Sequence, residues 1–214
     1  MSDHLDKTRN NRRDFDKDKL DGFIHEDPML FFNQWYQDAH EKNAADPHAV
    51  VLSTVDKDGQ PSSRIVYMRE LLSEGFIIYT NYLSRKGSEI LKNHKVAGLF
   101  YWDVLERQVR IEGEAVKIDS IISDDYFASR PRISQIGAWA SEQSSEIDNR
   151  LSLEERVKHF EEKYPNEVPR PPHWGGYLIK PQYFEFWQGR LGRLHDRLCY
   201  QKEGDSWRQF RIAP

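Results

Sequence analysis

The chain has 214 residues, enough for a sizeable core, and we expect a single domain over residues 25–214. Its 31 Lys and Arg side chains against 35 Asp and Glu give a net charge of −4, which argues against a protein that wraps nucleic acid or coats an anionic membrane. One cysteine excludes an internal disulfide framework, and no apolar run approaches the roughly 18 residues of a membrane span or forms a secretory signal. We therefore expect a cytoplasmic protein.

The N-terminal segment over residues 1–24 alternates charges of both signs and carries almost no apolar side chain before Leu20, so we expect a mobile arm. A helix of about four turns is predicted next. Asp27 can cap it, Pro28 suits its first turn, and Leu30, Phe31 and Trp35 recur with helical spacing.

Five β-branched and aromatic runs then change the period, at residues 49–55, 62–70, 76–81, 96–102 and 107–118. The segment DKDGQP between the first two runs is a strong hairpin signal. Short connections of this kind predict a mostly antiparallel sheet that curls into a barrel.

Helical segments interrupt these strands at residues 84–93, 120–130 and 151–164. A proline-rich loop leads to the segment YLIKPQYFEFWQ, and an EGDS turn joins two last strands around RLHDRLCYQKE and SWRQFRIAP. Because the helices do not alternate regularly with the strands, we expect a mainly β fold with flanking helices and not a doubly wound parallel sheet.

Familiar catalytic and nucleotide-binding motifs are missing from the sequence, which has no Walker loop, GxGxxG, HExxH, CxxC or GxSxG. The eight histidines show no metal-ligand spacing, and no metal site is expected. What remains is a set of cationic and amide residues at the ends of strands.

The first such cluster lies in YTNYLSRKGSEI, where a strand ends at Tyr79 and Thr80 and Ser84 can cap a helix. Arg85 and Lys86 then fall in the first helical turn, where they oppose the helix dipole. A phosphate held by both side chains and the free backbone N–H groups would turn this cost into a binding site. Two solvated charges, tolerated at modest cost, are the alternative.

A second cluster is formed by Tyr126 and Arg130, which are four residues apart and share a helix face. Pro131 breaks that helix, and Ser134 starts the next turn. Donors of these three kinds suit a second phosphate. Taken alone, a surface arginine beside a half-buried tyrosine is the simpler interpretation.

In RLHDRLC, strict alternation predicts a strand with Arg193, His195 and Arg197 on one face and Leu194 and Leu198 on the other. Three adjacent nitrogen-rich groups need an anionic or electron-rich partner. A solvated outer face is the alternative, but such faces usually mix charge signs, so we favour a site.

With these clusters identified, the sequence resembles the pyridoxine (pyridoxamine) 5′-phosphate oxidases over residues 12–214. The resemblance rests on RIVYMR, FIIYTNYLSRKG, LERQVRIEG, YFASRPRISQIGAWAS with EQSS, HWGGY, FEFWQG, RLHDR and the terminal RIAP. It implies an FMN-binding split barrel that forms a homodimer with flavin mononucleotide (FMN) at the subunit interface.

The resemblance also assigns residues to the site. Those implied to bind FMN are Arg64, Ile65, Val66, Tyr67, Met68, Arg69, Tyr79, Thr80, Arg85, Lys86, Gln108, Gln143, Ser144, Trp187 and Arg197. Among them, Arg64, Arg85 and Lys86 would hold the flavin phosphate, and Gln143 and Ser144 would reach the cofactor bound mainly by the other chain. Those implied to bind substrate are Arg69, Tyr126, Arg130, Ser134, Arg193, Leu194 and His195, with Arg193 and His195 as the catalytic pair facing the substrate ring.

This sequence departs from the family pattern at two places. The family usually has lysine where Arg69 stands, and arginine keeps the charge but changes its reach and geometry. Strict alternation sends Arg64 and Arg69 to opposite faces, so a strand end or a bulge must intervene if both serve one site. In the arm, RRDF (residues 12–15) matches a segment that can close over substrate, with Phe15 where a tyrosine is found.

The implied reaction is a step of vitamin B6 salvage that oxidises pyridoxamine or pyridoxine 5′-phosphate to pyridoxal 5′-phosphate. A hydride passes to the flavin, and dioxygen reoxidises it to give hydrogen peroxide. The alternatives are a split-barrel flavoprotein with another substrate and a non-catalytic binder of flavin or pyridoxal phosphate. The oxidase ranks first because it needs both phosphate clusters together with Arg193 and His195. A nucleic-acid-binding module ranks last, since the charge balance is acidic.

Overall fold

The computed structural model describes residues 14–21 and 24–214. Arg12 and Arg13 of the expected lid, and most of the expected arm, lie outside the described residues. The chain divides into two compact units, each built from several segments. Unit 1 comprises the described parts of Met1–Pro47 with Phe100–Arg110 and Tyr183–Pro214, and unit 2 comprises His48–Leu99 and Ile111–Gln182. The expectation of one domain over residues 25–214 stays a prediction.

Eight strands form one sheet in the order β3-β2-β1-β4-β5-β6-β7-β8, and an additional pairing of β3 with β6 closes the first six into a barrel. The strands are β1 Ala49–Val55, β2 Pro61–Leu72, β3 Gly75–Asn81, β4 Lys95–Trp102, β5 Arg107–Lys117, β6 Trp174–Gln188, β7 Asp196–Glu203 and β8 Ser206–Arg211. The pairings of β1 with β2, β2 with β3 and β3 with β6 are all antiparallel. The expected antiparallel split barrel is confirmed.

The barrel core of unit 2 follows from side-chain alternation along its strands. On β1, Val50, Leu52 and Thr54 are buried while the residues between them are half-buried, which is the two-residue period of a strand with one face on a core. Phe76 and Ile78 of β3 are also buried. Thr54 is the polar exception on this face, and its hydroxyl donates to the buried carboxylate of Glu89.

A β-bulge interrupts the pairing of β2 with β3. The register shifts between Met68 and Glu70, so Arg69 has no directly opposed partner on β3. An extra residue of this kind reverses which face the following side chains occupy. Of the two alternatives that the sequence left open if Arg64 and Arg69 were to serve one site, a strand end or a bulge, the structure has the bulge.

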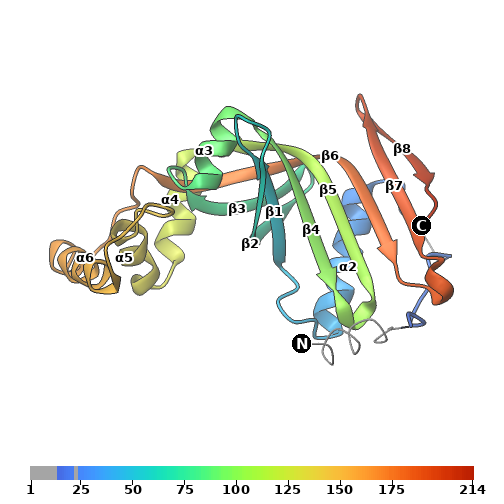
Figure 1. Ribbon diagram of the computed structural model, residues 1–214, viewed down its shortest axis with the longest axis horizontal. Helices are drawn as coiled ribbons and strands as arrows, with labels where there is room; N and C mark the ends of the chain where they lie inside the picture. The colour runs from blue at the N-terminus through green and yellow to red at the C-terminus, as the bar shows by residue number, and fades with distance from the viewer. Residues whose placement is uncertain (1–13, 22–23) are drawn as a thin grey trace, which may run out of the picture. The chain divides into compact units, whose positions relative to one another are not determined.

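Four helices belong to unit 2: α3 Arg85–Lys92, α4 Ser120–Ser129, α5 Arg132–Ala140 and α6 Arg150–Lys163. Figure 1 shows α4, α5 and α6 grouped together. They enclose a small apolar cluster in which Phe127, Ile136, Val168 and Trp174 are buried. Helix α3 begins as expected, since the Ser84 side chain accepts a hydrogen bond from the Gly87 backbone N–H.

Unit 1 is built around helix α2, Pro28–Glu41, whose N-cap Asp27 accepts a hydrogen bond from the Met29 N–H. Its aromatic face packs on strand residues, with the rings of Phe31 and Phe186 4.5 Å apart. Phe32 lies 5.0 Å from Phe100. Strands β7 and β8 form an antiparallel hairpin beside the second half of β6 (Figure 1).

The described part of the N-terminal segment is tied to unit 1 through Arg107. This buried guanidinium donates to Asp18 and to Asp38, each at 2.6 Å, and to Gln188 at 2.9 Å. Its face lies 4.5 Å from the centre of the Trp35 ring. Asp18 thus shares one cation with helix α2.

The predicted strand through RLHDRLC is wrong in its first half. A 3₁₀ turn occupies Leu191–Arg193, and β7 begins only at Asp196. Gly192 and Arg193 both have positive φ angles, of 63° and 65°, which no β-strand accommodates. Arg193 and His195 therefore precede the strand that carries Arg197, and the three residues do not share a strand face.

In the described ranges, no helix is both long and apolar enough to cross a membrane.

Strands β5 and β6 approach each other closely at Gly113. A Cβ atom there would lie 2.1 Å from the Lys180 carbonyl oxygen. We expect Gly113→Ala to lower the free energy of unfolding by about 1–3 kcal/mol, because backbone must move to admit the methyl group. Urea unfolding followed by tryptophan fluorescence measures the change.

The matched control is Gly137→Ala on α5, where nothing lies within 4 Å of the added Cβ atom. Alanine is the better helix former there, so this variant should be as stable as the parent or more so. Equal unfolding midpoints for the two variants would contradict the close contact between β5 and β6.

Candidate functional site

Unit 2 contains a cavity of about 540 Å³ beside the middle of β2, the end of β3 and the start of β6. It is lined by Arg64, Ile65, Val66, Tyr67, Arg69, Tyr79, Thr80, Asn81, Lys86, Tyr126, Arg130, Ser134, Gly137, Ala138, Ser141, Gln143 and Trp174. Arginine and lysine supply every charged side chain in this lining, and none of the described lining residues is a carboxylate. The cavity is therefore suited to an anion.

Most of the predicted residues of unit 2 meet in this lining, and three do not. Met68 is 4 % exposed and belongs to the barrel core. Ser144 is exposed, with a positive φ angle of 75°, in the loop after α5. Arg85 lies at the start of α3, and 57 % of its side chain is exposed. Their predicted contacts with FMN stay predictions.

Lys86 is the buried cation of the cavity. Its Nζ atom donates to Gln143 Oε1 at 2.7 Å, to Thr80 Oγ1 at 3.0 Å and to Ser84 Oγ at 3.3 Å. Burial, with the charge of Arg64 added, lowers the pKa of Lys86 to about 8. The ammonium is thus surrounded by neutral oxygens at the N-terminus of a helix, an arrangement that a bound anion would stabilise.

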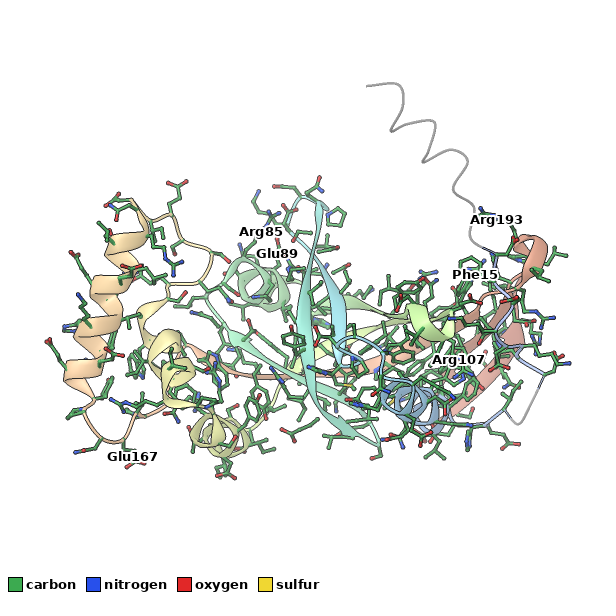
Figure 2. The ribbon with its side chains drawn as sticks, turned by 90° about the horizontal axis from the view of Figure 1, so that it is seen from below. Phe15, Arg85, Glu89, Arg107, Glu167 and Arg193 are labelled. Carbon is green, nitrogen blue, oxygen red and sulfur yellow. The ribbon has the colours of Figure 1, made fainter. Side chains whose placement is uncertain are left out.

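Glu89 connects the other two cations of this region. Its carboxylate lies one turn after Arg85 on α3, as Figure 2 shows, and accepts from Arg85 Nε at 2.8 Å. The same carboxylate accepts from Ser62 and lies 3.6 Å from Arg64 Nη2. Burial alone would raise the pKa of Glu89, but hydrogen bonds from Thr54, Arg85 and Ser62 outweigh it and the pKa is lowered. Part of the charge that opposes the helix dipole is thereby compensated within the protein.

Tyr126, Arg130 and Ser134 form the second group of donors in the lining. Helix α4 ends at Ser129, Arg130 follows in extended conformation, and α5 begins at Arg132, so the chain turns around this point. The Nη1 atom of Arg130 is buried and has no hydrogen-bond partner among the described residues. Burial lowers the pKa of Arg130, with a smaller repulsion from Arg69. A buried donor without an acceptor is costly, which points to an anionic ligand.

Three parallel aromatic rings stand beside this second group. Tyr79 and Tyr126 stack with ring centres 3.9 Å apart, and Trp174 lies 5.4 Å from Tyr79 with an interplanar angle of 8°. The hydroxyl of Tyr79 donates to Glu70 at 2.6 Å. Burial, and then this carboxylate, raise the pKa of Tyr79 well above its usual range, so the hydroxyl keeps its proton.

The remaining predicted residues, Gln108, Trp187, Arg193, Leu194, His195 and Arg197, belong to unit 1. Nδ1 of His195 accepts from the backbone N–H of Arg190 at 3.1 Å, and its ring lies 4.6 Å from that of Trp187. Burial and the neighbouring charge of Arg193 lower the pKa of His195, which favours the neutral ring. Since Nδ1 is an acceptor, the neutral ring carries its proton on Nε2.

Arg193 and Arg197 have different surroundings in unit 1. Arg193 and Leu194 are exposed on the turn before β7, where Figure 2 labels Arg193. Arg197 donates to Glu185 at 2.8 Å and to the Ala213 carbonyl. Glu185 is 1 % exposed and also accepts from Arg110 at 2.8 Å. The exposed guanidinium of Arg193 and the hydrogen-bonded guanidinium of Arg197 are therefore suited to different roles.

The donor set fits a ligand that carries a phosphate near Lys86 and Arg64, and a second anion near Arg130. FMN with a phosphorylated substrate has this charge pattern. By contrast, no group of three His, Cys, Asp or Glu side chains able to hold a metal ion occurs in the described part of the chain.

Sequence reasoning missed Trp174, Glu89, Asn81 and Ser141. Trp174 was visible in the motif HWGGY but had no assigned task. Glu89 follows Arg85 by four residues, a spacing that signals an ion pair on a helix. Asn81 and Ser141, whose side chain and carbonyl are 3.4 Å apart, carry no recognisable signal in the sequence.

Comparison with known proteins identifies the family of this chain. Residues 36–164 match the family model described as pyridoxamine 5′-phosphate oxidase. Residues 174–214 match the model of the pyridoxine 5′-phosphate oxidase C-terminal dimerisation region. Proteins named pyridoxine/pyridoxamine 5′-phosphate oxidase are 52 % identical in Haemophilus influenzae, over 89 % of this chain and 90 % of the relative, and 47 % identical in Acaryochloris marina, over 95 % and 94 %.

Solved structures agree as well. PhzG from Burkholderia lata, in complex with tetrahydrophenazine-1-carboxylic acid, superposes with a TM-score of 0.86 at 28 % identity, over 92 % of this chain and all of its own. A pyridoxamine 5′-phosphate oxidase-related, FMN-binding protein from Nostoc punctiforme shares the fold, with a TM-score of 0.71 at 16 % identity over 89 % of this chain and 100 % of its own. With two family models matching most of its length, this chain belongs to the pyridoxamine 5′-phosphate oxidase family of enzymes.

Proposed function

We propose that the protein oxidises pyridoxamine 5′-phosphate and pyridoxine 5′-phosphate to pyridoxal 5′-phosphate, with FMN as cofactor and dioxygen as acceptor. The observation that carries this proposal is the cavity of unit 2, which holds two separate groups of cationic donors and no lining carboxylate among the described residues. The proposal is supported by relatives that are named for this activity and share 52 % and 47 % of their aligned residues with this chain. Dioxygen leaves as hydrogen peroxide, and the amine substrate also consumes water and releases ammonia.

Arg64, Arg85 and Lys86 would hold the flavin phosphate. Lys86 meets it with a desolvated ammonium, and Arg64 and Arg85 are oriented by the shared carboxylate of Glu89. Counted with Glu89, the three cations leave a net charge of about +2 when Lys86 is protonated, which balances a phosphate dianion. Held by these residues, FMN would supply the redox chemistry of the reaction, as acceptor of a hydride equivalent from the substrate carbon next to the ring, with dioxygen as the final electron acceptor.

Tyr126, Arg130, Ser134 and Arg69 would hold the substrate phosphate. Arg193, Leu194 and His195 would position the substrate ring. With its proton on Nε2, neutral His195 can donate a hydrogen bond to an oxygen or ring group of the substrate, which orients it without adding charge. Arg69 keeps the positive charge of the usual lysine and, through the bulge, lines the same cavity as Arg64.

A homodimer with FMN at the subunit interface is part of the proposal, supported by the match to a dimerisation region. Gln108, Trp187 and Arg197 are included as FMN contacts on the resemblance. The sequence led us to expect Gln143 at the cofactor bound mainly by the other chain, but Gln143 accepts from Lys86 of its own chain, so we assign it instead to the cofactor whose phosphate its own chain binds. Ser144, the next residue in the same loop, is assigned to the same cofactor. A cytoplasmic location is also retained as a proposal.

A flavoprotein acting on another substrate is the second candidate, since the structurally similar PhzG holds a carboxylic acid that bears no phosphate. The group formed by Tyr126, Arg130 and Ser134 favours the phosphorylated substrate, because it adds a second cationic site to the one at Lys86.

The proposed activity is tested with purified protein loaded with FMN under anaerobic conditions. We expect pyridoxamine 5′-phosphate to bleach the flavin absorbance near its visible maximum, and admission of air to restore it with formation of pyridoxal 5′-phosphate and hydrogen peroxide. Pyridoxamine without the phosphate should react far more weakly, since the second cationic group has nothing to bind. The proposal would be wrong if the flavin of the FMN-loaded protein stayed oxidised in the presence of each of the two phosphorylated substrates.

Lys86 makes the preference for FMN over riboflavin pH-dependent. Its proton is lost above about pH 8 in the ligand-free protein, whereas a bound phosphate dianion would keep it in place. FMN affinity should therefore fall as pH rises through 8 and up to the ordinary lysine pKa, while riboflavin affinity changes much less. Fluorescence titration of both flavins between pH 7 and about 9.5 measures the ratio.

Lys86→Gln should weaken FMN binding at pH 7 and flatten this ratio. Lys92→Gln is the matched control, because it removes an exposed lysine from the last turn of the same helix. If the FMN-to-riboflavin ratio of Lys86→Gln equals that of the parent protein across the range, Lys86 does not bind the phosphate.

Arg193 and Arg197 should separate into a substrate role and a cofactor role. We expect Arg193→Ala to retain FMN and to be reduced by pyridoxamine 5′-phosphate on the order of a hundredfold more slowly, because a substrate misplaced by about 1 Å loses that much rate. Arg197→Ala should instead release FMN. Anaerobic stopped-flow reduction at saturating FMN gives the rates.

Arg208→Ala, which removes an exposed arginine of β8, is the control for a general loss of charge in unit 1. Should Arg193→Ala lose flavin and be reduced at the parent rate, the two roles are reversed.

A further inference from the structure

Arg130 is held in an unusual way for a buried arginine. Its guanidinium carbon lies 4.5 Å from the centre of the Trp174 ring and 5.6 Å from that of Phe127. No carboxylate is paired with it among the described residues, and Nη1 has no hydrogen-bond partner there. The side chain is thus supported by aromatic rings instead of by an opposite charge.

The Trp174 ring is itself fixed from several sides. It is 7 % exposed, lies parallel to Tyr79 and Tyr126 within 8° and 3°, and meets Phe127 edge to face at 5.1 Å. Its backbone is anchored too, because its N–H donates to the Pro171 carbonyl and its own carbonyl accepts from Arg170 Nη1 at 2.6 Å.

An aromatic ring and a carboxylate differ in how many N–H donors of a guanidinium they leave available to a ligand. A carboxylate binds in the guanidinium plane and occupies two of its N–H donors, so it competes with a phosphate for them. An aromatic ring attracts the cation through its π electrons and covers one face, which leaves the donors at the edge available. This is the situation of Arg130, which lines the cavity: the aromatic rings support its guanidinium, and its Nη1 atom stays available to a ligand.

We propose that Trp174 is a positioning residue for substrate phosphate: its ring fixes the guanidinium of Arg130 so that the edge donors face the phosphate ester. The inference rests on the proposed function, which assigns Arg130 to that phosphate. It adds that the preference for phosphorylated over unphosphorylated B6 compounds depends on a ring that makes no hydrogen bond to the phosphate itself.

The test compares Trp174→Leu and Trp174→Phe with the parent as FMN-loaded dimers. Dissociation constants are measured for pyridoxal 5′-phosphate and for pyridoxal, from the change each causes in the flavin spectrum. Trp174→Leu should weaken pyridoxal 5′-phosphate roughly three- to thirtyfold, the range of a cation–π contact, and leave pyridoxal unchanged. Trp174→Phe, which keeps a smaller ring, should fall between Leu and the parent, and it carries the test if the leucine variant fails to fold.

Kinetics and a double mutant separate positioning from general packing. With pyridoxamine 5′-phosphate, the KM of the Trp174 variants should rise while kcat stays close to that of the parent. In an Arg130→Gln background, Trp174→Leu should have no further effect on the phosphate preference, because the ring acts through Arg130. Trp139→Leu is the matched control, since Trp139 packs against the same apolar cluster and does not line the cavity.

Three outcomes would decide against the inference. An unchanged preference for pyridoxal 5′-phosphate in both Trp174 variants, with the parent showing the preference, overturns the inference and leaves the proposed function intact. Equal weakening of pyridoxal 5′-phosphate and pyridoxal shows that the ring is only structural. A parent protein that binds the two compounds equally overturns the assignment of Arg130, and with it the proposed function.

Discussion

The pairing of β3 with β6 is the constraint on which the cavity depends. It closes the barrel and sets Asn81 opposite Trp174, Thr80 opposite Gly175 and Tyr79 opposite Gly176. One register thereby brings residues of the first cationic cluster next to the tryptophan that supports the second. Both positions are too crowded for a side chain, because a Cβ atom at Gly175 would lie 2.2 Å from the Tyr82 hydroxyl, and one at Gly176 would lie 3.0 Å from the ring of Tyr79 on β3 and 2.3 Å from Ile118.

The same cavity shows two ways of keeping cations in a partly buried place. Around Arg64 and Arg85 the protein supplies a carboxylate, Glu89, and pays with a buried anion that needs three hydrogen bonds. Around Lys86 and Arg130 it supplies neutral oxygens and aromatic faces instead. The first arrangement fixes geometry, whereas the second leaves positive charge uncompensated and available to a ligand.

Much of this could be predicted from sequence, because it depends on local patterns. The strand runs, the Ser84 and Asp27 caps and the helices predicted at residues 84–93, 120–130 and 151–164 follow from period and capping chemistry, whereas helix α5 was expected only as a turn that starts at Ser134. Requiring Arg64 and Arg69 in one site predicted an irregularity of β2, either a strand end or a bulge, and the bulge at Arg69 is one of these alternatives. The turn at Leu191–Arg193 was missed because the alternation of RLHDRLC was counted from Arg193, whose left-handed conformation belongs to the turn before the strand and not to the strand itself. The stack of Tyr79, Tyr126 and Trp174 joins three distant segments, and no local period could reveal it.

The uncompensated positive charge in the cavity also lowers the stability of the protein when no ligand is bound. Burial already drives the pKa of Lys86 down by opposing its charged form, and Arg64 and Arg69 repel their neighbours Lys86 and Arg130. An anion that enters relieves this repulsion and binds only the folded chain, so it stabilises the fold by mass action, by about 2.7 kcal/mol at a hundred times its dissociation constant. The chain would therefore resist proteolysis best in cells well supplied with the phosphorylated cofactor, because the unfolded fraction that proteases attack is smallest there.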